Sequence, residues 1–192
     1  MRGILLTAFI ILNLCNSSEL FAKAIAIEQV PQGLLEHVLK RIENEPIKKD
    51  YLALIDMSQH SLRERLYLIR LSNMTVESFH VSHGRGSDKN NDGYADYYSN
   101  KAESNATSLG LYRATSTYTG KHGLSLRLRG LDETNDNAEV RAIVMHGADY
   151  VYEGNTGRSL GCPAVNNNVS SYIIERLKEG GYLYIGQSSL GY

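Results

Sequence analysis

The sequence predicts a mostly β or α+β domain with two peripheral helices. Short segments that alternate apolar and polar side chains recur along the chain, separated by clusters of Gly, Asn and Ser. Two stretches instead space their apolar residues as an amphipathic helix does. The 13 tyrosines add residues that favour strands, and there is no tryptophan. A chain of 192 residues fits one such domain with short appendages.

Residues 1–24 are expected to be a secretory signal peptide. Arg2 precedes an apolar run from Ile4 to Leu14, and the small residues Ala22 and Ala24 follow. A basic start, an apolar stretch of roughly 7–15 residues and a small-x-small exit are typical of such signals. The alternative is a buried N-terminal helix. Because the run is too short to span a bilayer comfortably, we expect an exported, periplasmic protein without stable membrane insertion.

Residues 25–49 are predicted to form an N-terminal helical segment. The apolar residues of "QGLLEHVLKRIENEP" recur at helical spacing, and Pro46 ends the pattern. A second, capped helix is expected in "NNNVSSYIIERLKEGG". We expect both helices to cover the outside of a β-rich core.

The remaining ordered segments read as strands. "YLALIDMS" and "RERLYLIRL" form a hairpin, and "NMTVESFHVSHG" supplies a third strand. Residues 84–109 are polar and are expected to form a long loop. Further strands are expected in "LGLYRATSTYTG", "LSLRLRGL", "AEVRAIVMHG" and the closing "YLYIG", with residues 143–145 buried.

Charge excludes some classes of partner. The chain has 20 basic and 21 acidic side chains, a net charge of −1. This balance gives no field that would favour nucleic acid or an anionic membrane, so a small polar substrate is the better expectation. No feature predicts self-association, and we expect a monomer.

One histidine and one cysteine carry the chemical signal. Removal of the signal peptide leaves Cys162 as the single cysteine, which is then intermolecular, incidental or reactive. His146 ends an apolar run and can serve as a base for a thiol. Gly161 frees the backbone, so that N–H groups of residues 160–162 can converge on an oxyanion. The alternative is a small buried cysteine beside a hydrogen-bonded surface histidine.

A family resemblance extends this chemistry. The segments "SHGRGS", "YTGKHGLSLRLRGLD", "RAIVMHGADYV" and "GRSLGCPAV" occur in this order between residues 50 and 186. Together they resemble the murein L,D-transpeptidase catalytic domains, a branch of the YkuD-type L,D-transpeptidases. That family's signature is a His-Gly followed by Ser-His-Gly-Cys, and Leu160 stands here in place of the second histidine. The resemblance implies an L,D-transpeptidase-type β-sandwich with peripheral helices over residues 50–192.

The resemblance also implies a mechanism. Cys162 attacks a peptidoglycan stem peptide beside its terminal D-alanine, and His146 takes the thiol proton. The carbonyl of Gly147 orients the His146 ring, Gly161 shapes the turn, and no metal or other cofactor is needed. The thioester then passes to an amine or to water. The alternatives are an L,D-carboxypeptidase or endopeptidase with the same pair, and a non-catalytic peptidoglycan-binding module.

Three further residues are candidates for substrate contact. Arg158 and Ser159 flank the nucleophile, and an arginine there can pair with a substrate carboxylate. His122 lies between two glycines, where the backbone can approach a ligand. Solvated loop residues are the alternative for all of them. His83, at the end of its strand, is expected to be structural.

"DKNNDGYAD" partly resembles a calcium-binding loop. Asp88, Asn90, Asp92 and Asp96 occupy ligand positions, and Gly93 occupies the turn position. Ser99 stands where a bidentate glutamate is needed, so we expect a polar loop rich in turn-forming residues and no metal site.

Overall fold

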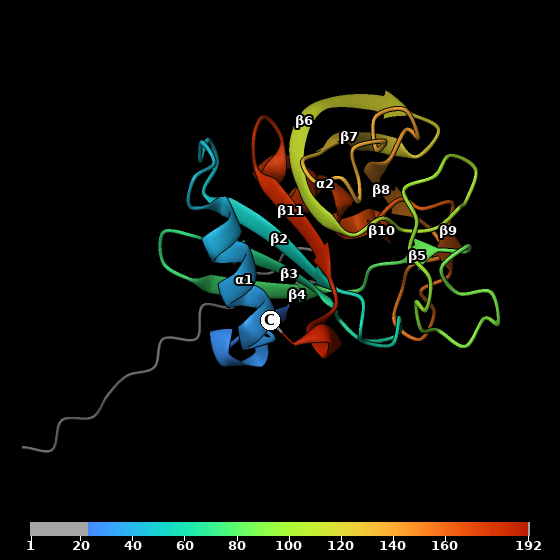
Figure 1. Ribbon diagram of the computed structural model, residues 1–192, viewed down its shortest axis with the longest axis horizontal. Helices are drawn as coiled ribbons and strands as arrows, with labels where there is room; N and C mark the ends of the chain where they lie inside the picture. The colour runs from blue at the N-terminus through green and yellow to red at the C-terminus, as the bar shows by residue number, and fades with distance from the viewer. Residues whose placement is uncertain (1–22, 192) are drawn as a thin grey trace, which may run out of the picture.

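The computed structural model describes residues 23–191. The predicted signal peptide therefore lies outside the described residues, except for Lys23 and Ala24, which belong to the first strand. The domain is mostly β with two α-helices, which confirms the predicted fold class (Figure 1). None of the described helices combines the length and the apolar character needed to cross a membrane.

The strands and helices follow the predicted order. The helices are α1 Gln32–Ile42 and α2 Asn167–Leu177. The strands are β1 Lys23–Ile25, β2 Tyr51–Asp56, β3 Leu66–Arg70, β4 Thr75–Phe79, β5 His83–Gly84, β6 Gly110–Gly120, β7 Gly123–Gly130, β8 Val144–Ala148, β9 Arg158–Ser159, β10 Ala164–Asn166 and β11 Tyr182–Gly186. The long polar loop lies between β5 and β6, as predicted.

Nine strands form one sheet in the order β1-β4-β3-β2-β11-β6-β7-β8-β10, and β5 pairs with β9. The predicted hairpin is β2 with β3, which are antiparallel. Two pairs within this sheet are parallel, β2 with β11 and β8 with β10, and the separate pair of β5 with β9 is parallel as well. The sheet bends around α2 along β6 (Figure 1), where the pairing register shifts between Ala114 and Thr117.

Each face of the sheet carries its own apolar core. Side chains alternate along a strand, so Leu52 and Leu54 of β2 face α1, whereas Ala53 and Ile55 face the core that contains α2. Burial on both faces explains why β2 reads as an almost continuous apolar run. The two helices therefore cover opposite faces of the sheet.

One predicted strand is shorter than expected. Of "AEVRAIVMHG", only the part from Val144 onward is a strand, and the preceding residues form successive turns. The N–H of Arg141 donates to the carbonyl of Asn137, and the N–H of Ala142 donates to that of Glu139. These local hydrogen bonds take the place of bonds to a neighbouring strand, so the chain turns before it enters the sheet. The predicted burial of residues 143–145 is confirmed.

Candidate active site

The loop that carries Cys162 is fixed by pairing with a distant segment. His83 and Gly84 of β5 pair in parallel with Arg158 and Ser159 of β9. Gly161 follows with a φ of +120°, and a Cβ there would lie 2.8 Å from the carbonyl oxygen of Ala106. Both the backbone angle and the close approach require glycine immediately before the thiol.

Ser159 lies beneath this loop and is 5% exposed. Its hydroxyl donates to the carbonyl of Cys162 at 2.6 Å and accepts the N–H of Gly161 at 3.0 Å. The Gly161 N–H is therefore already used within the loop. Among the described residues, neither the Leu160 N–H nor the Cys162 N–H has a protein acceptor, so these two backbone donors remain for a ligand.

His146 lies on β8 between two strands. It pairs with Ser125 of β7 and with Ala164 of β10, and it is 5% exposed. Its Nδ1 lies 2.9 Å from the carbonyl oxygen of Gly147, the contact that the resemblance implies. A carbonyl can only accept, so Nδ1 carries the proton of the neutral ring and Nε2 is left to accept one.

A second imidazole stacks on His146. The ring of His122, from the turn between β6 and β7, lies 4.3 Å from that of His146, centroid to centroid, with 27° between the planes. Burial lowers the pKa of His146, and the electrostatic effects of His122 and Lys121 lower it further, against the opposing effect of the bond to Gly147. His146 is therefore neutral at pH 7, as a base must be.

The Cys162 thiol lies at the end of the same pair of strands. Its Sγ is 3.8 Å from the carbonyl oxygen of Ala142. Burial raises the pKa of the thiol, against the opposing effects of the Val144 N–H and of Arg141. Among the described residues, no hydrogen bond joins Cys162 to His146. The parallel register instead places Cys162 two residues before Ala164, the lateral neighbour of His146.

The comparisons with known proteins identify the family of the chain. The family model described as L,D-transpeptidase catalytic domain matches residues 25–185. The chain belongs to this family. The predicted family is thus confirmed. No curated protein matches the chain.

Several solved structures of L,D-transpeptidases are similar to the chain at low sequence identity. One from Mycobacterium smegmatis is 11% identical, with a TM-score of 0.46, and the match covers 72% of this chain and 59% of that one. L,D-transpeptidase 3 from Mycobacterium tuberculosis is 10% identical (TM-score 0.46; 72% and 62% covered). One from Xylanimonas cellulosilytica is 14% identical (TM-score 0.42; 79% and 68% covered). The chain spans less than two thirds of the two mycobacterial proteins.

In this L,D-transpeptidase domain, a cavity of about 440 Å³ opens beside the imidazole pair. Its lining combines opposite charges with backbone and ring surfaces: Lys121, His122, Gly123, Gly147, Ala148, Asp149, Tyr150 and Asn167. The predicted contact residue His122 thus lines a space next to His146. A cavity of this size and polarity suits a small charged ligand such as part of a peptide.

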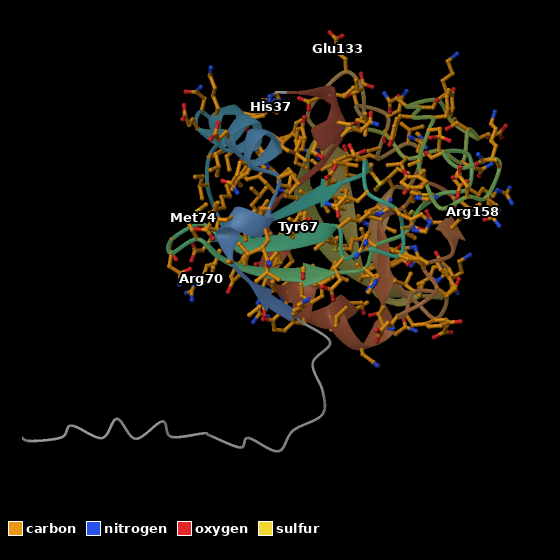
Figure 2. The ribbon with its side chains drawn as sticks, turned by 90° about the horizontal axis from the view of Figure 1, so that it is seen from below. His37, Tyr67, Arg70, Met74, Glu133 and Arg158 are labelled. Atoms are coloured by element: carbon orange, nitrogen blue, oxygen red, sulfur yellow. The ribbon has the colours of Figure 1, made fainter. Side chains whose placement is uncertain are left out.

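Arg158 is not among the residues that line that cavity. Its guanidinium donates to the carbonyl of Asp88, which ties the nucleophile loop to the long polar loop. Figure 2 shows Arg158 at the opposite end of the molecule from Arg70 and Met74. The contact partner observed for Arg158 is therefore backbone, and its contact with substrate stays a prediction.

The calcium-like segment is organised by its own hydrogen bonds. Asp88 is 1% exposed, and its carboxylate accepts from His83 and from the N–H groups of Asp92 and Gly93. Asp92 accepts from Asn90 and from the Tyr94 N–H. Within the described residues there is no cluster of His, Cys, Asp or Glu suited to a metal ion. His83 is fully buried in this network.

Arg141 lies beside the turn that carries the thiol, although no sequence pattern predicts a role for it. Arg141 precedes β8, and its guanidinium lies 3.1 Å from where a Cβ on Gly161 would be. Its presence in "RAIVMHGADYV" was visible, but a basic residue before a buried strand usually lies in solvent. The turn that brings it to Cys162 depends on tertiary contacts.

Proposed function

We propose that this chain is an exported cysteine acyltransferase that acts on peptidoglycan stem peptides through a thioester on Cys162. The parallel pairing of β8 with β10 carries the proposal. It puts the strand of a neutral, oriented imidazole next to the strand that follows the thiol. Bonds between catalytic groups are often long in free enzymes and shorten when substrate binds.

The resting state follows from the directions of the two pKa shifts. The pKa of the thiol is raised and that of His146 is lowered, so the neutral thiol and neutral imidazole predominate at pH 7. His146 Nε2 then takes the proton as Sγ bonds to the substrate carbonyl carbon. The Cys162 N–H stabilises the oxyanion. The C–N bond to D-alanine breaks, and the proton passes from His146 to the departing amine.

The thioester is resolved by a second nucleophile. Attack by the amine of another stem peptide forms a cross-link and releases Cys162. Attack by water yields a shortened peptide instead. We assign the first outcome to this chain, with substrate contacts from His122 at the adjoining cavity and Arg158 at the loop end.

The organisation of the chain fits a cell-wall substrate. We propose that residues 1–24 direct export, that residues 25–49 form a helical segment covering the sheet, and that residues 50–192 carry the chemistry. The site of action would be the periplasm, the partner the stem peptides, and the acting form a monomer. Neither nucleic acid nor a metal takes part.

The test is intact-mass spectrometry after incubation with a carbapenem, whose strained amide is attacked by a thiolate to leave an acyl adduct. We expect one adduct on the wild type and none on Cys162→Ala. His146→Ala should slow acylation by roughly 10²–10⁴-fold, the usual contribution of a general base. His37→Ala, on α1 away from the loop, is the matched control and should react at the wild-type rate (Figure 2).

A tetrapeptide muropeptide then separates the products. Dimers with released D-alanine support transpeptidation, whereas tripeptides alone indicate a carboxypeptidase. The absence of any adduct on folded protein, with a thiol that alkylates only after unfolding, would overturn the proposal in favour of a binding module.

A further inference from the structure

A single arginine lies against the turn that carries the thiol. The Arg141 guanidinium donates to the carbonyl oxygens of Ala106 (2.6 Å) and Ser99 (2.8 Å), and to the hydroxyl of Ser108 (3.2 Å). Ala106 O is also the atom that a Cβ on Gly161 would meet at 2.8 Å. The arginine, the polar loop and the Gly161-Cys162 turn are therefore packed in direct contact.

These partners are all neutral. Among the ion pairs of the described residues, none includes Arg141. Burial lowers the pKa of Arg141, and the titratable groups that oppose this effect are Tyr112 and Cys162. Partly buried cations are usually paired with an anion, because desolvation penalises an uncompensated charge.

Only one of those two groups ionises within a useful range of pH. Tyr112 is fully buried, its hydroxyl bonds to Ser108, and burial holds its pKa well above the ordinary value of 10. Cys162 is half-buried, and its thiolate is the form that reacts. The anion available to Arg141 is thus the Cys162 thiolate.

The backbone next to Arg141 is shaped around the same sulfur. Ala142 has a φ of +52°, in the left-handed region that costs an alanine roughly 1–2 kcal/mol. This bend places the carbonyl oxygen of Ala142 3.8 Å from Cys162 Sγ, while the side chain of Arg141 extends to the turn at Gly161. Unfavourable backbone angles of this kind persist where the surrounding structure holds them, often at functional sites.

We propose that Arg141 is a positioning residue that supplies the counter-charge for the Cys162 thiolate as the thiol is deprotonated. It rests on the proposed role of Cys162 as nucleophile. His146 is neutral at rest, and Leu160, two residues before the thiol, is 61% exposed and uncharged. Arg158 belongs to the same loop, but its guanidinium donates to the carbonyl of Asp88. Arg141 is therefore the cation that packs against the Gly161-Cys162 turn before substrate arrives.

The test is the pH dependence of alkylation of Cys162 by iodoacetamide, followed by peptide mass mapping so that Cys15 does not interfere. Arg141→Gln should raise the apparent pKa of the thiol by about one unit or more, the effect of losing a nearby opposite charge. Alkylation near pH 7.5 should then slow by roughly tenfold. Arg141→Lys keeps the charge but loses the planar fork, so its profile should stay within a few-fold of the wild type.

Arg129→Gln is the matched control, because Arg129 is exposed on β7 and pairs with Glu139. Its alkylation profile should equal that of the wild type. A wild-type profile for Arg141→Gln would overturn the proposal. Equal impairment of Arg141→Lys and Arg141→Gln would also overturn it, because that pattern indicates a purely structural arginine. If Arg141→Gln does not fold, the alkylation profile of Arg141→Lys decides.

Alkylation requires no acyl transfer, so the two proposals can fail separately. An unchanged thiol pKa in Arg141→Gln, with normal carbapenem adducts on the wild type, removes only the role of Arg141. Iodoacetamide labelling that depends on Arg141, without any carbapenem adduct, removes the acyltransferase and leaves an activated thiol.

Discussion

Under α1, the sheet is held by apolar side chains that alternate between its two faces, with Leu52, Leu54 and Tyr182 fully buried. At the loop end, the fully buried side chains include Arg65 and His83, with Asp88 at 1% exposure. The first region follows a repeating pattern that tolerates exchange among apolar residues. The second depends on individual donors and acceptors, because each buried polar atom must find its own partner.

The network at the loop end is fully connected. Arg65 donates to the carbonyls of Val81 and Gln59, and to His83 Nδ1 at 2.8 Å. His83 Nε2 donates to Asp88 at 3.2 Å. The carbonyl of His83 lies 3.3 Å from the Ser159 hydroxyl, so this network supports the floor of the nucleophile loop. Thus α1 and its strands stabilise the fold, whereas buried polar groups set the geometry of the site.

The largest effect is expected from Leu54→Ala in the region under α1. Leu54 is fully buried, so its truncation leaves a cavity and should lower the free energy of unfolding by about 2–5 kcal/mol, measured by urea denaturation. The acylation rate per folded molecule should not change. Leu160→Ala, at an exposed position, is the control and should alter stability by less than about 0.5 kcal/mol. A large fall in the acylation rate of folded Leu54→Ala would erase the distinction between the regions.

Acidification should act on the loop end. Burial and the charge of Arg65 lower the pKa of His83 to about 4, from an ordinary 6.5, despite the opposing effect of Asp88. Between pH 4 and pH 6.5 this histidine binds a proton in the unfolded chain but not in the folded one. The stabilisation from neutral His83 is therefore complete above pH 6.5 and is lost as the pH falls towards 4. The loss should be on the order of 3 kcal/mol.

Unfolding free energies measured between pH 4 and 7 check this expectation. His83→Gln removes the titrating group, so the remaining pH dependence should be shallower, whereas His37→Gln should keep the wild-type slope. An equally steep slope in His83→Gln would mean that other groups govern the acid response.

The smallest change in stability should come from Ser159→Ala, which removes the hydroxyl beneath the nucleophile loop. Loss of its bonds to Cys162 and Gly161 should cost about 1 kcal/mol of folding free energy. The loop then loses its fixed shape, and carbapenem acylation should slow by roughly tenfold, equivalent to about 1.4 kcal/mol. Ser171→Ala, exposed on α2, is the matched control for both measurements. Unchanged acylation would show that Ser159 does not shape the site.

Local sequence patterns determined the two helices, the hairpin of β2 with β3, the β6–β7 pair and the polar loop, because these depend on periodicity and turn residues. The motifs around His146 and Cys162 determined the family. The role of Gly161 could also be predicted, because a glycine directly before a nucleophile in a turn indicates a backbone conformation that other residues rarely adopt.

Only the tertiary structure decided which residues meet at the thiol. The parallel pairs β2–β11 and β8–β10 join segments that no local pattern links. Arg141 reaches the turn of Gly161, next to Cys162, because the chain turns at Ala142, where the sequence favoured a longer strand. Ser159 is buried where β9 pairs with the distant β5, and its hydroxyl lies 3.3 Å from the carbonyl oxygen of His83. Such contacts arise from burial and hydrogen-bond geometry in three dimensions, which residue spacing along the chain does not encode.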